Sequence, residues 1–356
     1  MKKHNYSAGP CILPQEVFEK SAQAILNFNN SDLSILEISH RSKDFVAVME
    51  EARALALELL GLEGKGYQAL FLAGGASMEF LMAPYNLMKE NGKAAYLDSG
   101  TWASAAIKEA KFFGETVVVA SSKNEHYNHV PKGYTVPADA DYFHCTSNNT
   151  IFGTQMKEFP DLDIPMVCDM SSDIFSRNID FSKFGIIYAG AQKNMGPAGA
   201  TLVVVKEEIL GKSGRHIPSM LDYEKHIKAE SMYNTPPVFP VYASLLTLQW
   251  LKNLGGISAI EKINNAKANL LYTEIDRNPL FVGTAAIEDR STMNATFLLD
   301  TPLHTDTFNA MLKEAGIIGL PGHRSVGGYR ASMYNAMPLE SVQVLVDVMK
   351  DLENRV

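Results

Sequence analysis

The chain has 356 residues, of which 46% are hydrophobic and 20% are charged. This composition is typical of a globular protein of about two domains, and it excludes a disordered, collagen-like or coiled-coil chain. Lys and Arg number 32 against 40 Asp and Glu, so the net charge is −8, and no long run of like charges occurs. These charges argue against a nucleic-acid-binding protein.

The cysteines and the apolar segments indicate the compartment. The three cysteines contain no C-x-x-C pair, and their odd number argues against a disulfide framework, so a reducing compartment fits best. The first residues include two lysines but lack the apolar stretch of a signal peptide. No run approaches the roughly 18 apolar residues of a transmembrane helix. We therefore expect a cytoplasmic protein that binds neither membranes nor nucleic acid.

Short β-rich runs alternate with helical stretches in the middle of the chain. Helices are predicted at about residues 78–89 and 102–113. Continuous apolar runs are typical of strands buried on both faces, and alternation with helices predicts an open, mainly parallel α/β sheet. The predicted strands are residues 69–73, 94–97, 116–120, 142–145, 166–168, 185–188 and 201–205.

The last hundred or so residues follow a different pattern, which indicates a smaller α+β domain. Two glycines near residue 255 mark the boundary region, which extends to about residue 263. We expect a large α/β domain over residues 16–257 and a small domain that combines residues 1–15 with residues 258–356. Helices are predicted at residues 241–254, 257–275, 306–315 and 339–352, with a strand near residues 295–299.

Residues 74–77 (GGAS) lie between a predicted strand and a predicted helix. Glycines let backbone N–H groups approach an anion closely, and the N-terminus of a helix adds its positive dipole end. The segment matches neither the P-loop nor the dinucleotide pattern. It suits a phosphate site, although an ordinary tight turn can have the same sequence.

Lys193 follows a predicted strand within a segment bounded by glycines, residues 190–196. Small apolar neighbours would desolvate the amine, which disfavours the ammonium form and lowers the pKa. An amine of this kind is a nucleophile that forms Schiff bases with carbonyl groups. Most lysines are solvated surface charges, and the pattern by itself leaves that alternative open.

Asp169 ends a predicted strand, at the edge of an α/β sheet where ligands bind. Lys193 comes one strand–connection–strand step later, so both side chains can line this edge. A helix cap is the alternative for Asp169. Trp102 begins a predicted helix, where an indole can stack on a flat ligand or pack into the core. Trp250 lies inside a periodic helix and is expected in the core.

Two groups of cations complete the candidates. His40 and Arg41 follow an apolar run, and His323, Arg324 and Arg330 lie in a glycine-rich segment. An arginine side chain binds carboxylate and phosphate through two parallel hydrogen bonds. The cations therefore predict a site for a substrate with two anionic ends, with ordinary surface arginines as the alternative.

Together these segments resemble the phosphoserine aminotransferase family, class V aminotransferases of the pyridoxal-phosphate-dependent fold-type I superfamily. The most specific stretches are AGAQKN at residues 189–194 and the glycine-rich segment at residues 322–337. The resemblance implies a large domain with a mainly parallel mixed sheet, a smaller α+β C-terminal domain, pyridoxal 5'-phosphate as cofactor and no metal. The matching stretches are residues 7–10, 38–43, 74–77, 99–102, 188–194, 233–237 and 322–337.

The resemblance also implies a role for each candidate at the cofactor. Lys193 would form the Schiff base, and Asp169 would pair with the pyridinium nitrogen. Trp102 would stack on the ring, and Thr150 would hydrogen-bond the ring hydroxyl. The cofactor phosphate would be held by Ala76, Ser77 and Gln192, and by Asn234 and Thr235 of the partner in a homodimer with composite sites.

The implied reaction is the reversible transfer of the amino group of L-glutamate to 3-phosphonooxypyruvate, which yields O-phospho-L-serine and 2-oxoglutarate. It serves serine biosynthesis and, in some bacteria, pyridoxine biosynthesis. Arg330 would bind the α-carboxylate of either substrate, and Lys193 would move the Cα proton as general base and acid. The second anion of each substrate would contact His40, Arg41, His323 and Arg324, some of them across the dimer interface.

Residues 147–150 (SNNT) depart from the family, which more often shows Asn-Glu-Thr, so the detail of this loop stays open. Three other functions compete. A cysteine desulfurase needs a mobile cysteine, normally in the C-terminal half, but no cysteine follows Cys168. A class V aminotransferase for alanine or serine with glyoxylate would not need two His-Arg pairs. A non-catalytic metabolite-binding protein would not need Lys193, Asp169 and Trp102 together.

Overall fold

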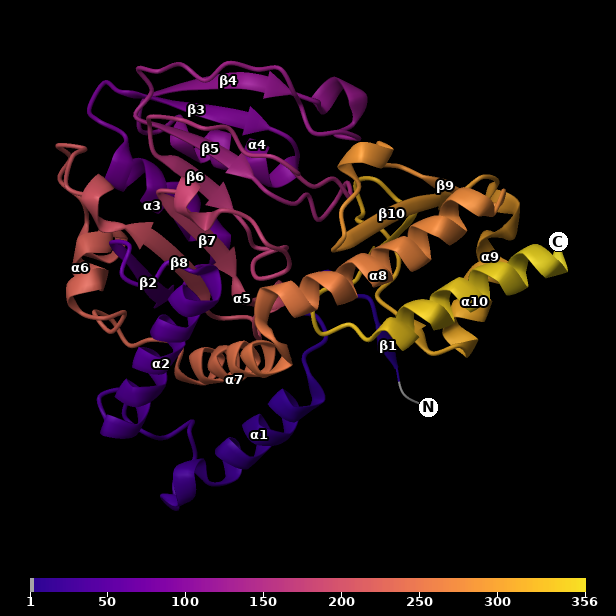
Figure 1. Cartoon of the computed structure of the whole chain (residues 1–356), viewed down its shortest axis with the longest axis horizontal. Coiled ribbons are helices and arrows are strands. Elements are labelled where there is room, and N and C mark those ends of the chain that lie inside the picture. The colour runs from indigo at the N-terminus through magenta and orange to yellow at the C-terminus, as the bar shows by residue number, and fades with distance from the viewer. Residues whose placement is uncertain (1–2) are drawn as a thin grey trace.

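A seven-stranded sheet forms the centre of the larger part of the molecule in the computed structural model, which describes residues 3–356 (Figure 1). The strands lie in the order β2-β8-β7-β6-β5-β3-β4. β8 is antiparallel to both of its neighbours, and every other pair is parallel. The predicted α/β class with a mainly parallel mixed sheet is confirmed. The strands are β2 (Tyr67–Leu72), β3 (Lys93–Asp98), β4 (Glu115–Ser121), β5 (Tyr142–Thr146), β6 (Met166–Asp169), β7 (Ile186–Gly190) and β8 (Thr201–Lys206).

The central strands are buried along their whole length, which explains their continuous apolar sequences. Every residue of β5, β6 and β7 is buried. Successive side chains of a strand point to opposite faces, so Tyr142 and Phe143 belong to two different hydrophobic clusters. All seven predicted strands are present, each within two residues of its expected bounds.

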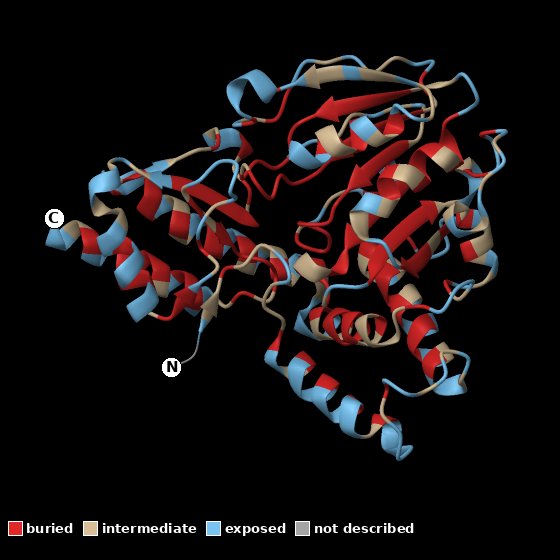
Figure 2. Ribbon diagram, turned by 180° about the vertical axis from the view of Figure 1, so that it is seen from behind, coloured by how far each residue is buried: buried red, intermediate tan, exposed pale blue. Residues whose placement is uncertain are grey.

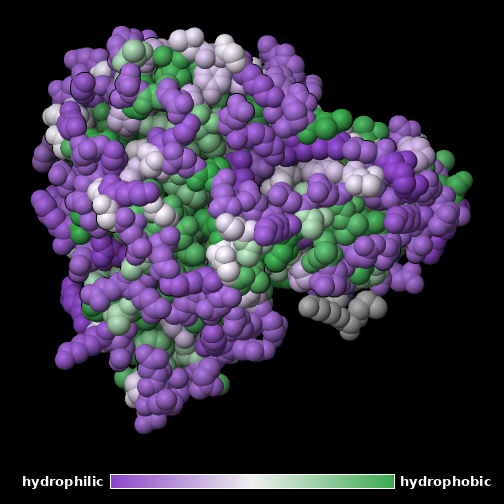
Figure 3. All heavy atoms as spheres, in the orientation of Figure 1, coloured by the Kyte–Doolittle hydropathy of each residue, from purple (hydrophilic) through white to green (hydrophobic). Residues whose placement is uncertain are grey.

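Helices cover both faces of this sheet. α3 (Gly75–Leu87) and α4 (Thr101–Ala110) pack on one face, and α2 (Lys43–Leu60) and α7 (Val238–Leu254) pack on the other. Figure 2 shows the buried residues, in red, concentrated on the strands and on the inner sides of these helices. The outer rim of the molecule is mostly hydrophilic (Figure 3).

The sequence analysis predicts no element before residue 69, whereas the structure has α1 (Gln15–Leu26) and α2 there. The sequence does carry the signals that begin and end α2. The hydroxyl of Ser42 accepts a hydrogen bond from the backbone N–H of Phe45 at 3.3 Å, and Gly61 ends the helix in the left-handed conformation with a φ of 65°. α2 was therefore predictable from capping residues and apolar spacing.

The helix predicted at residues 78–89 begins earlier, at Gly75. Gly74 has a φ of 110°, a conformation that residues with a Cβ rarely adopt, and it lets the chain pass from β2 directly into α3. The turn is therefore shorter than expected. Two short helices of this part, α5 (Ala191–Asn194) and α6 (Tyr223–Lys228), are absent from the predictions.

The remainder of the chain forms a smaller sheet and three helices. The sheet has the order β12-β10-β9 and is antiparallel, and β1 (His4–Asn5) pairs in parallel with β11 (Ile317–Ile318). The helices predicted here are present. The other elements are α8 (Gly256–Arg277), α9 (Thr305–Glu314), α10 (Leu339–Arg355), β9 (Phe281–Gly283), β10 (Asn294–Leu299) and β12 (Tyr329–Ser332).

One hydrophobic cluster joins the beginning of the chain to its end. It contains Tyr6 together with residues between 268 and 352, and the hydroxyl of Tyr6 donates a hydrogen bond to the carbonyl oxygen of Ser341 at 2.6 Å. Helix α8 contributes Ile257 and Ile260 to a core of the large sheet, and Leu271 to this cluster. The domain bounds at residues 15/16 and 257/258 stay a prediction. No helix within residues 3–356 has the length and apolar character needed to cross a membrane.

Candidate active site

Six strands of the large sheet end at one edge. β8 is antiparallel to both β2 and β7, so β2 points the same way as β7, β6, β5, β3 and β4. The segments that follow these strands carry most of the predicted cofactor residues. Because parallel strands present their carboxyl ends at one edge, the topology brings those segments together. They are residues 74–77 after β2, 99–102 after β3, 147–150 after β5, Asp169 at the end of β6, and Lys193 just after β7.

Lys193 lies in α5, directly after β7, with its side chain turned into the molecule. The Nζ atom donates a hydrogen bond to Oγ1 of Thr150 at 2.8 Å. Burial lowers the pKa of the amine, and the positive charge of Arg330 adds to this effect, whereas the negative charge of Asp169 opposes it. The alternative of a solvated surface lysine is therefore wrong. The amine is held next to a hydroxyl group in surroundings that disfavour the ammonium form.

Asp169 is 4% exposed. Its Oδ1 atom accepts a hydrogen bond from the backbone N–H of Ser171 at 2.9 Å. Burial raises the pKa of the carboxyl group, and the charge of Lys193 opposes that shift. The Oδ2 atom receives no hydrogen bond from residues 3–356, so it is free to accept one from a bound group with an N–H donor.

Residues 74–77 comprise Gly74, which makes the turn from β2, and the first three residues of α3. The first N–H groups of any helix lack intrahelical partners, and here these groups belong to residues that include Ala76 and Ser77. Ala76 is half-buried and Ser77 is exposed. The turn therefore presents unpaired backbone donors at the same edge as Asp169, an arrangement that suits an anion.

Trp102 lies in the first turn of α4, and 38% of it is exposed, so it is not a core residue in this chain. Ser99 and Gly100, which precede α4, are joined to the loop after β5 by one hydrogen bond. The side-chain amide of Asn149 donates it to the carbonyl oxygen of Ser99. A Cβ on Gly100 would collide with the Asn149 side chain. Trp250 packs against the core of the large sheet, as expected, although it is only partly buried.

Arg330 reaches the site from β12 of the smaller sheet. Its Nη1 atom donates a hydrogen bond to the carbonyl oxygen of Thr150 at 3.4 Å. Its Nε atom is buried and has no partner within residues 3–356. Arg330 also borders a cavity of about 800 Å³ whose wall includes Thr101 and Ile151. Thr150 therefore contacts both a lysine and an arginine, and the cavity borders this group through Arg330.

The other predicted residues form no side-chain hydrogen bond with this centre within residues 3–356. Gln192 is half-buried, and its side-chain amide lies near Gly190. The hydroxyl of Ser325 pairs with Nδ1 of His323 at 2.7 Å in an exposed loop. Within residues 3–356, no side-chain hydrogen bond or ion pair joins the remaining candidates to Lys193, Asp169 or Arg330. These candidates are His40, which is half-buried, and the exposed Arg41, Asn234, Thr235, His323 and Arg324.

Sequence reasoning missed two buried asparagines that hold the site together. The side-chain amide of Asn148 donates hydrogen bonds of 2.8 Å to Ser172 and to Asn294 of β10. Asn194, the residue after Lys193, donates to the carbonyl oxygen of Ile174 at 2.7 Å and accepts from the N–H of Asn335 at 2.9 Å. The unusual Asn-Asn pair was the only sequence signal for Asn148.

Within residues 3–356, no group of three or more His, Cys, Asp or Glu side chains is arranged to hold a metal ion. The residues of the site suit an organic cofactor with an aldehyde, a ring N–H and a phosphate. A ring that carries an N–H donor could approach Oδ2 of Asp169, and a phosphate could approach the first turn of α3. An aldehyde would then meet the amine of Lys193.

Comparison with known proteins gives matches along the whole chain. The family model for class-V aminotransferases matches residues 4–345. The phosphoserine aminotransferase of Flavobacterium psychrophilum is 84% identical and is covered, like this chain, to 100%. The phosphoserine aminotransferase structure from Bacillus circulans subsp. alkalophilus has a TM-score of 0.96 and 43% identity, with 99% of both chains covered. A phosphoserine aminotransferase from Trichomonas vaginalis with bound pyridoxal phosphate has a TM-score of 0.93 and 36% identity, with 98% of this chain and 100% of that chain covered.

Proposed function

The chain belongs to the class-V aminotransferase family, and we propose that it transfers the amino group of L-glutamate to 3-phosphonooxypyruvate, with O-phospho-L-serine and 2-oxoglutarate as products. The match to phosphoserine aminotransferases over the whole chain carries this proposal. The desolvated amine of Lys193, which interacts with the charge of the buried Asp169, supports it.

We propose pyridoxal 5'-phosphate as the cofactor. When bound, it supplies an aldehyde that bonds to amines and a ring that accepts electrons. Lys193 would hold the aldehyde, and the free Oδ2 atom of Asp169 would face the ring nitrogen. Trp102 would stack on the ring, and Thr150 would bind its hydroxyl group. The phosphate would be held by the N–H groups of Ala76 and Ser77 and by the side chain of Gln192.

Lys193 would also move the proton of the reaction. A general base must be neutral to accept a proton, and burial lowers the pKa of this amine toward that condition. The Nζ atom would accept the proton from Cα of the substrate as general base and then donate it to the cofactor carbon as general acid. Thr150 would orient the amine through their hydrogen bond of 2.8 Å.

Arg330 would bind the α-carboxylate that both substrates share. Its unpartnered Nε atom, its half-buried position and the adjacent cavity support this role. A guanidinium without a carboxylate partner is strongly stabilised by an anion that accepts two parallel hydrogen bonds from it. The second anion of each substrate, a phosphate or a carboxylate, would contact His40, Arg41, His323 and Arg324.

We further propose a homodimer in which each subunit completes the site of the other. Asn234 and Thr235 are exposed, and within residues 3–356 neither forms a side-chain hydrogen bond with Lys193, Asp169 or Arg330, so they would serve the phosphate of the partner's site. Exposed large apolar side chains are typical of a surface that a partner covers. Leu26 (78% exposed) and Leu36 (64% exposed), which precede His40 in the chain, support a dimer interface in this region. The free thiols of all three cysteines support action in the reducing cytoplasm.

The decisive experiment is a substrate comparison with purified enzyme and added pyridoxal phosphate. We expect turnover with glutamate and 3-phosphonooxypyruvate, and far slower turnover with alanine and glyoxylate. Faster turnover with alanine and glyoxylate would support the competing class V activity. A protein that binds phosphoserine without turning it over would instead be a non-catalytic binding protein.

A further inference from the structure

A second carboxyl group is buried behind the site. Glu79 lies in the second turn of α3, and its side chain is 0% exposed. The hydroxyl of Tyr223, from α6, donates a hydrogen bond to Oε2 of Glu79 at 2.6 Å. The Oε1 atom is buried and has no partner within residues 3–356. None of the roles proposed above uses this group.

Glu79 and Asp169 lie on the same side of the large sheet. Paired residues of neighbouring parallel strands project to the same face, and Tyr188 of β7 pairs with Asp169 of β6. α3 covers that face, since the ring of its Phe80 contacts the ring of Tyr188 edge to face, with 6.3 Å between the ring centres. Two ionisable carboxyl groups are thus enclosed between α3 and the sheet.

The surroundings of Glu79 disfavour a negative charge. A carboxylate oxygen that is buried without a hydrogen-bond donor is costly in free energy. Burial raises the pKa of Glu79 to about 7, the hydrogen bond from Tyr223 opposes this shift, and the negative charge of Asp169 adds to it. The titratable groups that face Glu79 are Tyr223 of α6, Tyr188 of β7 and Asp169 of β6, and none of these can supply a positive charge. Nε2 of His144 of β5 lies 2.7 Å from the hydroxyl of Tyr188, but burial lowers the pKa of this histidine to about 3, so it is neutral.

We propose that Glu79 is a positioning residue of the transamination site: it holds a proton in the cofactor-free protein and, by releasing that proton to water as the pH rises, controls the charge behind Asp169. Ionised Glu79 repels the negative charge of Asp169. Asp169 and the ring nitrogen that it faces therefore hold their shared proton more tightly. The activity then extends to higher pH than Asp169 alone would allow. The effect on the ring nitrogen rests on the proposed function, whereas the proton on Glu79 does not.

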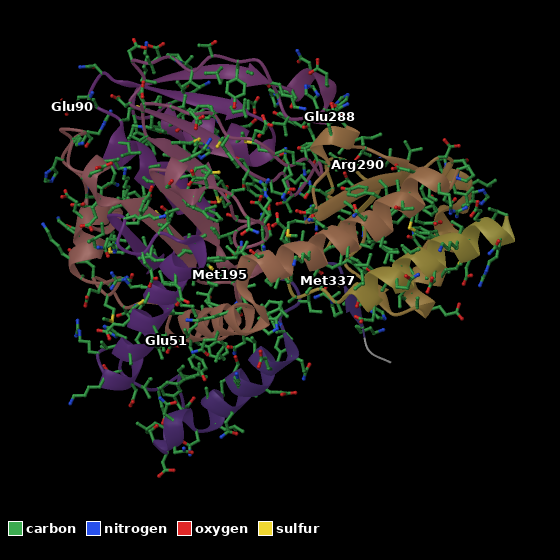
Figure 4. All side chains as sticks on the ribbon, in the orientation of Figure 1. Glu51, Glu90, Met195, Glu288, Arg290 and Met337 are labelled. Carbon is green, nitrogen blue, oxygen red and sulfur yellow. The ribbon has the colours of Figure 1, made fainter. Side chains whose placement is uncertain are left out.

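Infrared spectroscopy of the cofactor-free full chain tests the proton directly. The C=O stretch of a protonated carboxylic acid separates from that of carboxylates. The infrared difference spectrum, wild type minus Glu79→Gln, should contain this C=O band at about pH 5.5 and lack it by about pH 8.5. Glu90→Gln is the matched control, since Glu90 is exposed at the periphery of the molecule and its loss should leave the band unchanged (Figure 4). Absence of the band from wild type at about pH 5.5 would overturn the proposal.

Tyr223→Phe provides a second, independent variant. It removes the donor that stabilises ionised Glu79 and leaves the shape of the side chain nearly unchanged. The band should therefore persist to higher pH than in wild type. If the pH at which half of the band is lost stays the same or falls, the proposed hydrogen bond from Tyr223 to ionised Glu79 is contradicted. This variant keeps the test possible if Glu79→Gln does not fold.

The coupling to Asp169 is tested in the enzyme loaded with pyridoxal phosphate. In Glu79→Gln, the fall in kcat at high pH and the matching pH-dependent change in cofactor absorbance should both shift to lower pH by roughly one unit. In Glu90→Gln, both should match wild type. If neither shifts in Glu79→Gln, the coupling between Glu79 and Asp169 is refuted. A wild type that shows the infrared band but no transamination would refute the proposed function and leave the proton on Glu79 established.

Discussion

The Nζ atom of Lys193 donates a hydrogen bond of 2.8 Å to Oγ1 of Thr150. The two residues follow β7 and β5, which are not neighbours, because β6 lies between them and ends at Asp169. The hydrogen bond therefore links the segments that follow the two strands on either side of β6, whose last residue is Asp169.

Replacement of Lys193 by Ala should abolish both covalent attachment and turnover. The amine is the only group proposed to hold the aldehyde and to move the Cα proton, so kcat should fall by at least a factor of about 10³. Borohydride reduction followed by mass spectrometry would detect the adduct in wild type and none in the variant. Lys111→Ala, at an exposed position, is the control. Persistent turnover in Lys193→Ala would refute the assignment.

Replacement of Arg330 by Ala should weaken the reaction of both substrates. Both carry an α-carboxylate, so kcat/KM for glutamate and for phosphoserine should fall roughly a hundredfold or more. Steady-state kinetics with each substrate measures this. The exposed Arg355 offers a matched Arg→Ala control. A loss confined to one substrate would place Arg330 at the second anion instead.

Composite sites can be tested by mixing two inactive variants. If Arg41 serves the partner's site, a mixed dimer of Lys193→Ala and Arg41→Ala subunits contains one intact site. After unfolding and refolding an equal mixture, random pairing should restore about a quarter of the wild-type activity. Each variant refolded alone is the control. Activity that does not rise above the two controls would place Arg41 in the site of its own subunit.

Gly100→Ala should destabilise the protein through one identified contact. A Cβ at this position collides with the side chain of Asn149, so the free energy of unfolding should fall by about 1–3 kcal/mol. Urea unfolding measures this loss. Adding Asn149→Ala removes the collision, so the double variant should lose less than the sum of the two single losses. Strict additivity would show that the two residues do not collide.

Glu79→Gln should change how the stability of the cofactor-free protein depends on pH. Burial raises the pKa of Glu79 from 4.5 to about 7, so the folded chain holds this proton more tightly than the unfolded chain. The resulting stabilisation is complete below about pH 4.5 and is lost as the pH rises to about 7. Across that window, wild type should lose about 3 kcal/mol relative to the variant, as measured by urea unfolding. If the difference in unfolding free energy between wild type and Glu79→Gln does not change with pH, the raised pKa of Glu79 is contradicted.

The sequence alone determined the strands of the sheet and the strand ends at which the candidate residues Asp169 and Lys193 lie. Runs of apolar residues identified the strands, and the order of strands and helices predicted a mainly parallel sheet. In such a sheet, the residue after a strand lies at the carboxyl edge, so Asp169 and Lys193 could be placed together before any coordinates existed. The early helix α2 was missed although Ser42 and Gly61 mark its ends.

Tertiary structure decided which distant side chains share a buried space. Tyr223 donates a hydrogen bond to Glu79 from 144 positions away, and Asn148, in the loop after β5, donates one to Asn294 of the smaller sheet. Nothing in the local pattern of either residue indicates its partner, because a hydrogen bond between distant segments depends on how layers pack rather than on neighbouring residues. For the same reason, the charge state of Glu79 follows from burial, which only the folded chain creates.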